Sequence, residues 1–85
     1  MLRFMPKDVI ANQGDAPNQF YLLLKGKVSK YNSNGEHEKD YLPGMCFNER
    51  AVIYQMLSTG TYIAKERTYV IVIKAEHYDQ IIRKA

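Results

Sequence analysis

The stretch of sequence that decides the fold is FYLLLKGKVSKY, residues 20–31. Its first residues form a strand-like apolar run, Gly26 interrupts that run, and alternation resumes in residues 28–31. A second run, YVIVI at residues 69–73, is apolar on both faces, which favours a strand covered on each side. Because Phe20 and Tyr21 point to opposite faces of a strand, we expect one to be much less exposed than the other. The residues expected to lie largely inside are Tyr21, Leu23, Val28, Phe47, Ile71 and Ile73.

Turn signals separate these runs from shorter ones. Gly14 and Asp15 follow an apolar run at 9–11, Asn34-Gly35 suits a tight hairpin loop because it supplies positive φ angles, and Pro43-Gly44 forms another turn. Helical patterns occupy residues 49–56, with Asn48 at the N-cap, and residues 76–83. Short strands separated by turns about every eight to twelve residues predict a mainly β fold, a small β-roll trimmed with short helices.

Composition and charge restrict the class of protein. A chain of 85 residues with net charge +3 and 46% hydrophobic content is expected to be one folded domain. Cys46, the only cysteine, excludes an internal disulfide or a cysteine-based zinc site. We expect a cytoplasmic location without membrane insertion, because neither a long apolar run nor a signal peptide is present. The basic residues form no stripe, so nucleic acid is not expected as a partner.

The pattern of reactive side chains predicts no catalysis. No nucleophile stands with a base and an orienting group, so we expect no catalytic residue. His37 and His77 are isolated and lack the His-x-His and Glu arrangement of a metal-binding cupin, so neither a metal nor a cofactor is expected. Cys46 is expected to be a small buried apolar side chain.

Taken in order and spacing, four segments resemble the cyclic nucleotide-binding domain family. They are an opening strand and Gly-Asp turn at 6–15, a "Phe-Tyr-hydrophobic … Gly-x-Val" stretch at 20–28, a lead into a phosphate-binding cassette at 42–47, and closing strands at 63–73. The resemblance implies a jelly-roll β-roll related to the cupin double-stranded β-helix, with short helices in the cassette and at the C-terminus. It implies one domain, 1–85, without the lid helix that usually follows in the family. It also implies a kinase, channel or other effector domain in the same or a partner chain.

The cassette is where the chain departs from the family pattern. That pattern reads Phe-Gly-Glu-hydrophobic-Ala and, after a short helix, Pro-Arg-x-Ala-Thr. Here the two parts are FNERA at 47–51 and LSTGT at 57–61, so that Asn48 replaces the glycine and Ser58 the arginine. The resemblance implies cAMP or cGMP as the ligand. The binding residues that it implies are Asn48, Glu49, Arg50, Ala51, Ser58 and Thr59.

Four of the six cassette residues have a second interpretation. Glu49 accepts a hydrogen bond from the ribose 2′-hydroxyl in the family pattern, or is a solvated glutamate in a first helical turn. Arg50 is a substitute phosphate clamp or a surface arginine. Thr59 stands where cGMP-selective relatives carry a threonine that contacts guanine, or is structural. Asn48 either keeps the left-handed backbone of a glycine or caps the helix with its side chain and fills the ligand site.

These observations lead to one preferred hypothesis for function and two alternatives. The preferred hypothesis is a cyclic-nucleotide sensor domain, not itself an enzyme, that regulates a larger protein such as a kinase. Loss of a charge-assisted bond worth about 1.5–3 kcal/mol is expected to weaken its affinity about 10- to 150-fold. The first alternative is a degenerate domain of the same fold that serves protein contacts without nucleotide. The second is a small cupin-like enzyme, which the missing metal ligands disfavour.

Overall fold

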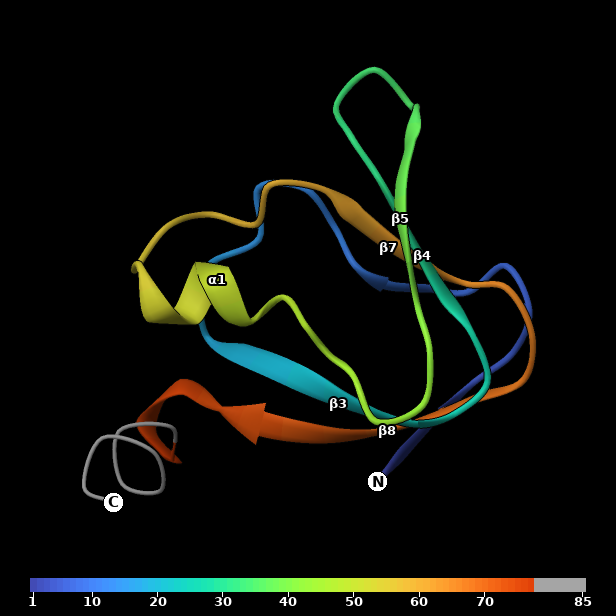
Figure 1. Cartoon of the computed structure of the whole chain (residues 1–85). Helices are drawn as coiled ribbons and strands as arrows, with labels where there is room; N and C mark the ends of the chain where they lie inside the picture. The colour runs from blue at the N-terminus through green and yellow to red at the C-terminus, as the bar shows by residue number, and fades with distance from the viewer. Residues whose placement is uncertain (78–85) are drawn as a thin grey trace.

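The computed structural model describes residues 1–77, which form two four-stranded antiparallel sheets and a short helix, α1 (Glu49–Ile53) (Figure 1). The first sheet has the strand order β1 (Leu2–Phe4), β8 (Thr68–Lys74), β3 (Gln19–Lys25) and β6 (Cys46–Phe47). The second has the order β2 (Val9–Ala11), β7 (Thr61–Ala64), β4 (Val28–Tyr31) and β5 (His37–Tyr41). The predicted mainly β fold is confirmed. Most of the helix predicted at 76–83 lies outside the described residues.

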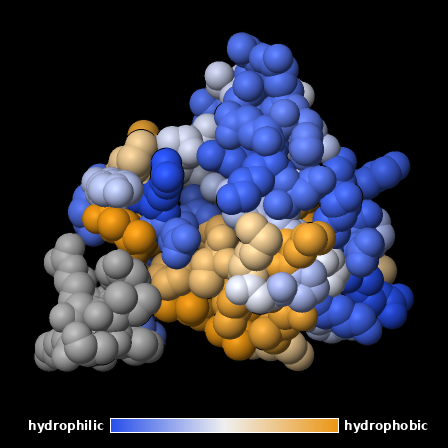
Figure 2. Space-filling model, in the orientation of Figure 1, coloured by the Kyte–Doolittle hydropathy of each residue, from blue (hydrophilic) through white to orange (hydrophobic). Residues whose placement is uncertain are grey.

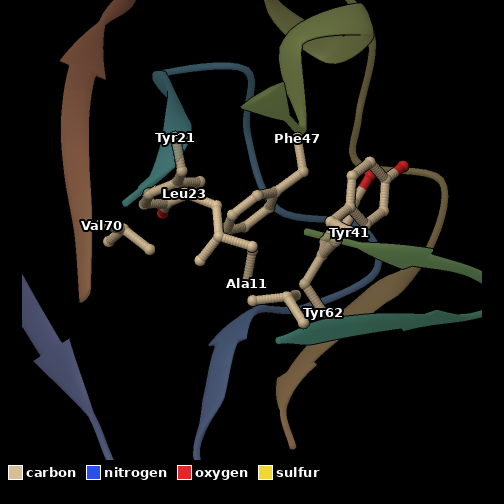
Figure 3. Close-up of a cluster of buried hydrophobic side chains, with 8 residues drawn as sticks. Ala11, Tyr21, Leu23, Tyr41, Phe47, Tyr62 and Val70 are labelled. Carbon is tan, nitrogen blue, oxygen red and sulfur yellow. The ribbon is translucent and has the colours of Figure 1, made fainter. Parts of the chain in front are cut away.

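The core lies between the two sheets and is centred on Phe47, which is 1% exposed (Figure 3). The Phe47 ring stacks on Tyr21 with a centroid distance of 5.0 Å and lies 5.2 Å from Tyr62 and 5.7 Å from Tyr41. Such aromatic pairs add to the free energy gained from burial alone. Because β6 is only Cys46 and Phe47, this ring cluster holds the start of the cassette against the core.

Two expectations about strand faces are wrong. Phe20 and Tyr21 are both buried, at 2% and 6% exposure, although one was expected to be much more exposed. That expectation assumed a strand with one face in water, whereas β3 is covered at this end on both faces. Ile71 was expected inside but is 38% exposed, and Ile73 is half-buried.

The reason for the exposure of Ile71 is the register of β3 against β8. Leu23 pairs with Val70, both fully buried, whereas Leu22 pairs with Ile71 on the outer face of the sheet. Apolar residues therefore also gather on the outside of this sheet, and Figure 2 shows a hydrophobic area where β3 and β8 lie in Figure 1. A run that is apolar on both faces does not require that both faces be buried.

Two loop details shape the cassette and the chain around it. Gly26, between β3 and β4, has φ +104, and a Cβ built there would lie 2.5 Å from the carbonyl oxygen of Arg67, so this turn requires glycine. Helix α1 ends at Ile53, earlier than the predicted residue 56. Gln55 has φ 54 and the N–H of Met56 donates to the carbonyl of Ala51 at 3.0 Å, which is a Schellman ending made without glycine.

Candidate functional site

A cavity of about 480 Å³ opens beside the cassette. One wall is Cys46 and the first part of the cassette, residues 47–51, together with Thr59. The opposite wall comes from the β4–β5 hairpin and contains Lys30, Glu38, Lys39 and Tyr41, with Tyr62 of β7 completing it. In Figure 1, α1 and the β4–β5 hairpin stand on either side of this region. The cavity has a volume typical of small-ligand sites.

Five of the six predicted binding residues are in the described cavity wall: Asn48, Glu49, Arg50, Ala51 and Thr59. Glu49 and Arg50 are exposed and lie in the first turn of α1, whereas Ala51 is buried beneath them. Ser58 is not among the described residues of the wall and is only 3% exposed. The structure thus brings the two parts of the cassette together but places Ser58 behind the cavity surface.

Asn48 combines a glycine-like backbone with a side chain engaged inside the protein. Its φ of 63 and ψ of 13 are left-handed, a conformation that asparagine tolerates better than most residues. Within the described residues its side chain makes no capping hydrogen bond to α1, so the interpretation in which it fills the helix N-terminus is wrong. Instead, its Nδ2 donates to the carbonyl of Gln19 at 3.2 Å.

Ser58 is the second partner of Asn48. The Ser58 hydroxyl donates to Asn48 Oδ1 at 3.0 Å and shares its hydrogen with the carbonyl of Gly60 at 3.2 Å. The backbone of Ser58 is also held, because its N–H donates to Asp15 and its carbonyl accepts from Gly14. The two parts of the cassette are therefore bonded to each other through Asn48 and Ser58.

The hairpin wall carries the lysines of the cavity. Lys30 and Lys39 are directly paired in the register of β4 and β5. The ammonium of Lys30 donates to Thr59 Oγ1 at 2.9 Å and lies 3.3 Å from Glu38 Oε2, while Lys39 lies over the Tyr41 ring at 5.0 Å. Among the described residues, these basic side chains of the hairpin face the cassette across the cavity.

The aromatic part of the cavity wall is neutral. Burial raises the pKa of the Tyr62 hydroxyl, and the neighbouring Tyr41 adds to the rise. Burial also raises the pKa of Tyr41 and that of the Cys46 thiol. These groups therefore stay protonated near neutral pH and offer hydrogen bonds rather than charge. Cys46, expected to be buried, is half-buried and lies in the cavity wall.

The hairpin residues of the cavity were absent from the predicted site, although a signal for them exists. Lys30 follows the buried Val28 by two residues, and Lys39 precedes the buried Tyr41 by two. Residues two apart on a strand share a face, so the same alternation that predicts the core also places both lysines on the face of the hairpin that carries Val28 and Tyr41. Over residues 1–77, no group of three or more His, Cys, Asp or Glu side chains is placed to hold a metal. Nor does any helix in that range have the length and apolar character needed to cross a membrane.

Comparison with known proteins agrees with this architecture. The family model for the cyclic nucleotide-binding domain matches residues 1–85. The chain is 38% identical over 65 residues to a cGMP-dependent protein kinase of Plasmodium berghei (strain Anka), covering 76% of the chain. It is 32% identical over 79 residues to that of Toxoplasma gondii, covering 93% of the chain. It spans 8% of the length of each kinase.

Solved structures give the same answer for the fold. The regulatory subunit of a cAMP-independent protein kinase A from Trypanosoma brucei superposes with a TM-score of 0.91 at 19% identity, covering 96% of this chain and 30% of that one. The regulatory domain of Toxoplasma gondii PKA, crystallised with cAMP, gives 0.90 at 22% identity, covering 95% and 33%. With the family model matching its full length, the chain belongs to the cyclic nucleotide-binding domain family.

Proposed function

We propose that this domain binds a cyclic nucleotide, cAMP or cGMP, in the cavity beside the cassette and serves as the ligand-sensing part of a larger regulatory protein. The observation that carries the proposal is the position of Glu49. It retains the family's ribose-binding residue type, lies in the cavity wall and is exposed there. The left-handed backbone at Asn48 supports it further, because the chain enters α1 as a glycine would allow.

Affinity is proposed to be lower than in relatives that have the cassette arginine. The second part of the cassette, LSTGT at 57–61, contains no cation of its own. Ser58 is also buried, and its hydroxyl already has two acceptors. The effector that reads the site is proposed to be a kinase or another effector domain in the same or a partner chain, since two relatives are cGMP-dependent protein kinases.

A degenerate domain used for protein contacts is the second candidate. One observation favours it: Asn48 and Ser58, at the positions of the family's glycine and arginine, satisfy each other inside the protein. In a domain that does not bind a ligand, such an internal bond satisfies buried polar groups that would otherwise need a phosphate as partner.

Calorimetric titration with cAMP and cGMP, and with their 2′-deoxy forms, tests the proposal. Glu49→Gln is expected to weaken binding about tenfold, because a carboxylate accepts a stronger hydrogen bond than an amide. The 2′-deoxy ligands are expected to bind the wild type weakly and to be insensitive to Glu49→Gln, since the shared partner is already gone. Glu66→Gln removes the same charge from an exposed residue that is not in the described cavity wall, and is expected to change nothing.

Two results would contradict the proposal in different ways. No binding of either nucleotide at millimolar concentration would favour the protein-contact alternative. Binding that survives both Glu49→Gln and removal of the 2′-hydroxyl would place the ligand away from Glu49.

A further inference from the structure

We propose that Lys30 supplies the cation for the anionic group of the bound ligand, from strand β4 instead of from the cassette. The inference rests on the proposed function and names a residue that the family pattern does not include. The ligand class is a nucleotide with one negatively charged phosphodiester.

The position of the Lys30 ammonium is the first observation. Its Nζ donates to Thr59 Oγ1 at 2.9 Å, and both residues line the cavity. Thr59 directly follows Ser58, the position of the missing arginine. The Lys30 side chain is only 16% exposed, so its charge is held in place rather than free in solvent. A positive charge therefore reaches the second part of the cassette, carried by a different strand.

Gly60 is the second observation. A Cβ built at Gly60 would lie 2.7 Å from both Lys30 Cε and the carbonyl oxygen of Tyr31, and 3.1 Å from Lys30 Cγ, so the lysine stem and the β4 backbone together fill the space that a side chain at 60 would need. The family pattern has alanine at this position. Ser58 and Gly60 flank Thr59, and the two departures from the pattern fit together. One removes the arginine, and the other lets the cassette pack closely against the backbone of β4 and the stem of its lysine.

The pairing of Lys30 with Lys39 is the third observation. Like charges directly opposite each other on neighbouring strands destabilise a sheet, yet these two are register partners and both line the cavity. Glu38 offsets the charge of Lys30, but its side chain is 41% exposed, and such exposed ion pairs contribute little. A bound phosphodiester would balance both lysines and can take the place of Glu38.

The chemistry of lysine sets what this site can recognise. An ammonium is a compact charge with three donors, of which Thr59 and Glu38 engage two. It attracts a phosphate oxygen without the two-pronged geometry of a guanidinium. Lys30 therefore replaces the charge of the arginine but not its bidentate fit.

The test compares charged and uncharged ligands. Wild type, Lys30→Met and Lys65→Met are titrated calorimetrically with cAMP, cGMP and the uncharged nucleosides adenosine and guanosine. Methionine keeps the length of the stem and removes the ammonium, with its charge and its hydrogen bond to Thr59. Lys65 is a matched control, because its ammonium lies over the Tyr31 ring at 4.9 Å, as that of Lys30 lies over the Tyr62 ring at 5.9 Å, and Lys65 is not in the described cavity wall.

Lys30→Met is expected to weaken cyclic-nucleotide binding about 10- to 150-fold and to leave nucleoside binding within about twofold. Lys65→Met is expected to leave both unchanged. Lys30→Arg is expected to retain most of the affinity, and Glu38→Gln to increase it, because the lysine loses its competing partner. Should Lys30→Met fail to fold, as judged by urea unfolding, Lys30→Arg and Glu38→Gln are used instead. The first is expected to retain most of the affinity and the second to increase it.

The outcomes separate the two levels of the proposal. If Lys30→Met binds cyclic nucleotide as strongly as the wild type does, the role of Lys30 is overturned and the proposed function is not. The same holds if Lys30→Met loses nucleoside and cyclic-nucleotide affinity equally. Unchanged or weaker binding by Glu38→Gln does the same. No binding by the wild type at millimolar ligand overturns the proposed function and the role of Lys30 with it.

Discussion

The carboxamide of Asn48 and the hydroxyl of Ser58 are hydrogen-bonded to each other at 3.0 Å, and both residues are buried. They are ten residues apart, one before α1 and the other after it. The bond therefore joins the two parts of the cassette across the helix.

This bond predicts energetic coupling between positions 48 and 58. Ser58→Ala leaves Asn48 Oδ1 without its donor in a buried site and is expected to lower the free energy of unfolding by about 1–3 kcal/mol. In the Asn48→Gly background the same change is expected to cost less, with a coupling energy of about 0.5 kcal/mol or more. Urea unfolding of the four proteins measures it. Ser33→Ala, in the exposed hairpin loop, is the control, and strictly additive losses would contradict the prediction.

A comparison of Gly26 with Gly14 separates two costs of replacing glycine by alanine: a steric clash of the new Cβ and the strain of a positive φ angle. Both have positive φ, +104 and +85, but a Cβ at Gly26 would lie 2.5 Å from the Arg67 carbonyl oxygen, whereas no described atom lies within 4 Å of one at Gly14. Gly26→Ala is expected to lower the free energy of unfolding by about 1–3 kcal/mol more than Gly14→Ala. Equal losses in denaturant unfolding would show that strain alone decides.

The contacts of Asp40 predict that part of the free energy of unfolding is lost only at acidic pH. Its carboxylate accepts hydrogen bonds from Ser29 at 2.6 Å and from His37 at 2.7 Å, and lies 3.6 Å from the Lys27 ammonium. The Ser29 bond first, then His37, lowers the pKa of Asp40 to about 2. A pKa below the unfolded value of about 3.9 means that the contribution is complete above pH about 4 and disappears as the pH falls through about 2.

Carbon-13 NMR titration of the Asp40 carboxyl measures this pKa directly. Ser29→Ala is expected to raise it, and Asp40→Asn is expected to unfold with a smaller dependence on pH between about 4 and 2 than the wild type. An ordinary pKa near 4 in the wild type would refute the arrangement.

Val70 and Ile71 are neighbours on β8 with different surroundings. Val70 is fully buried between the sheets, and Ile71 is 38% exposed on the outer face. Val70→Thr places a hydroxyl in the core and is expected to cost about 1–3 kcal/mol of unfolding free energy, whereas Ile71→Thr is expected to cost about 1 kcal/mol or less. Thermal and urea unfolding decide, and a larger loss at Ile71 would contradict the assigned register.

The fold was predictable because its determinants are local. Turn residues such as Gly26 and the Asn34-Gly35 pair mark where strands end, and alternation around Val28 places one face in the core. The exposure of Ile71 was not predictable, because an apolar run does not tell which of its faces the second sheet will cover. The early end of α1 was missed because Gln55, rather than glycine, takes the left-handed position.

The candidate site was predictable only where it follows a linear motif. The resemblance pointed to Glu49 and its neighbours, which the structure places in one cavity wall. Lys30 comes from another strand, and its relation to Thr59 depends on the pairing of β4 with β7 and β5. The bond between Asn48 and Ser58 depends on a left-handed backbone at 48, which turns the amide away from the helix and toward the serine. Neither relation can be derived from spacing along the chain.

The shared hydrogen of Ser58 has a consequence for the order in which substitutions can accumulate. With glycine at 48, a serine at 58 still has the carbonyl of Gly60 as an acceptor, so it is accommodated alone. An asparagine at 48 with no hydroxyl at 58 would have the same left-handed backbone, but its Oδ1 would lose the donor that Ser58 supplies, leaving the bond from Nδ2 to Gln19. The order in which residues 48 and 58 are changed therefore decides the stability of the intermediate: serine with glycine keeps every buried polar group paired, whereas asparagine without serine does not.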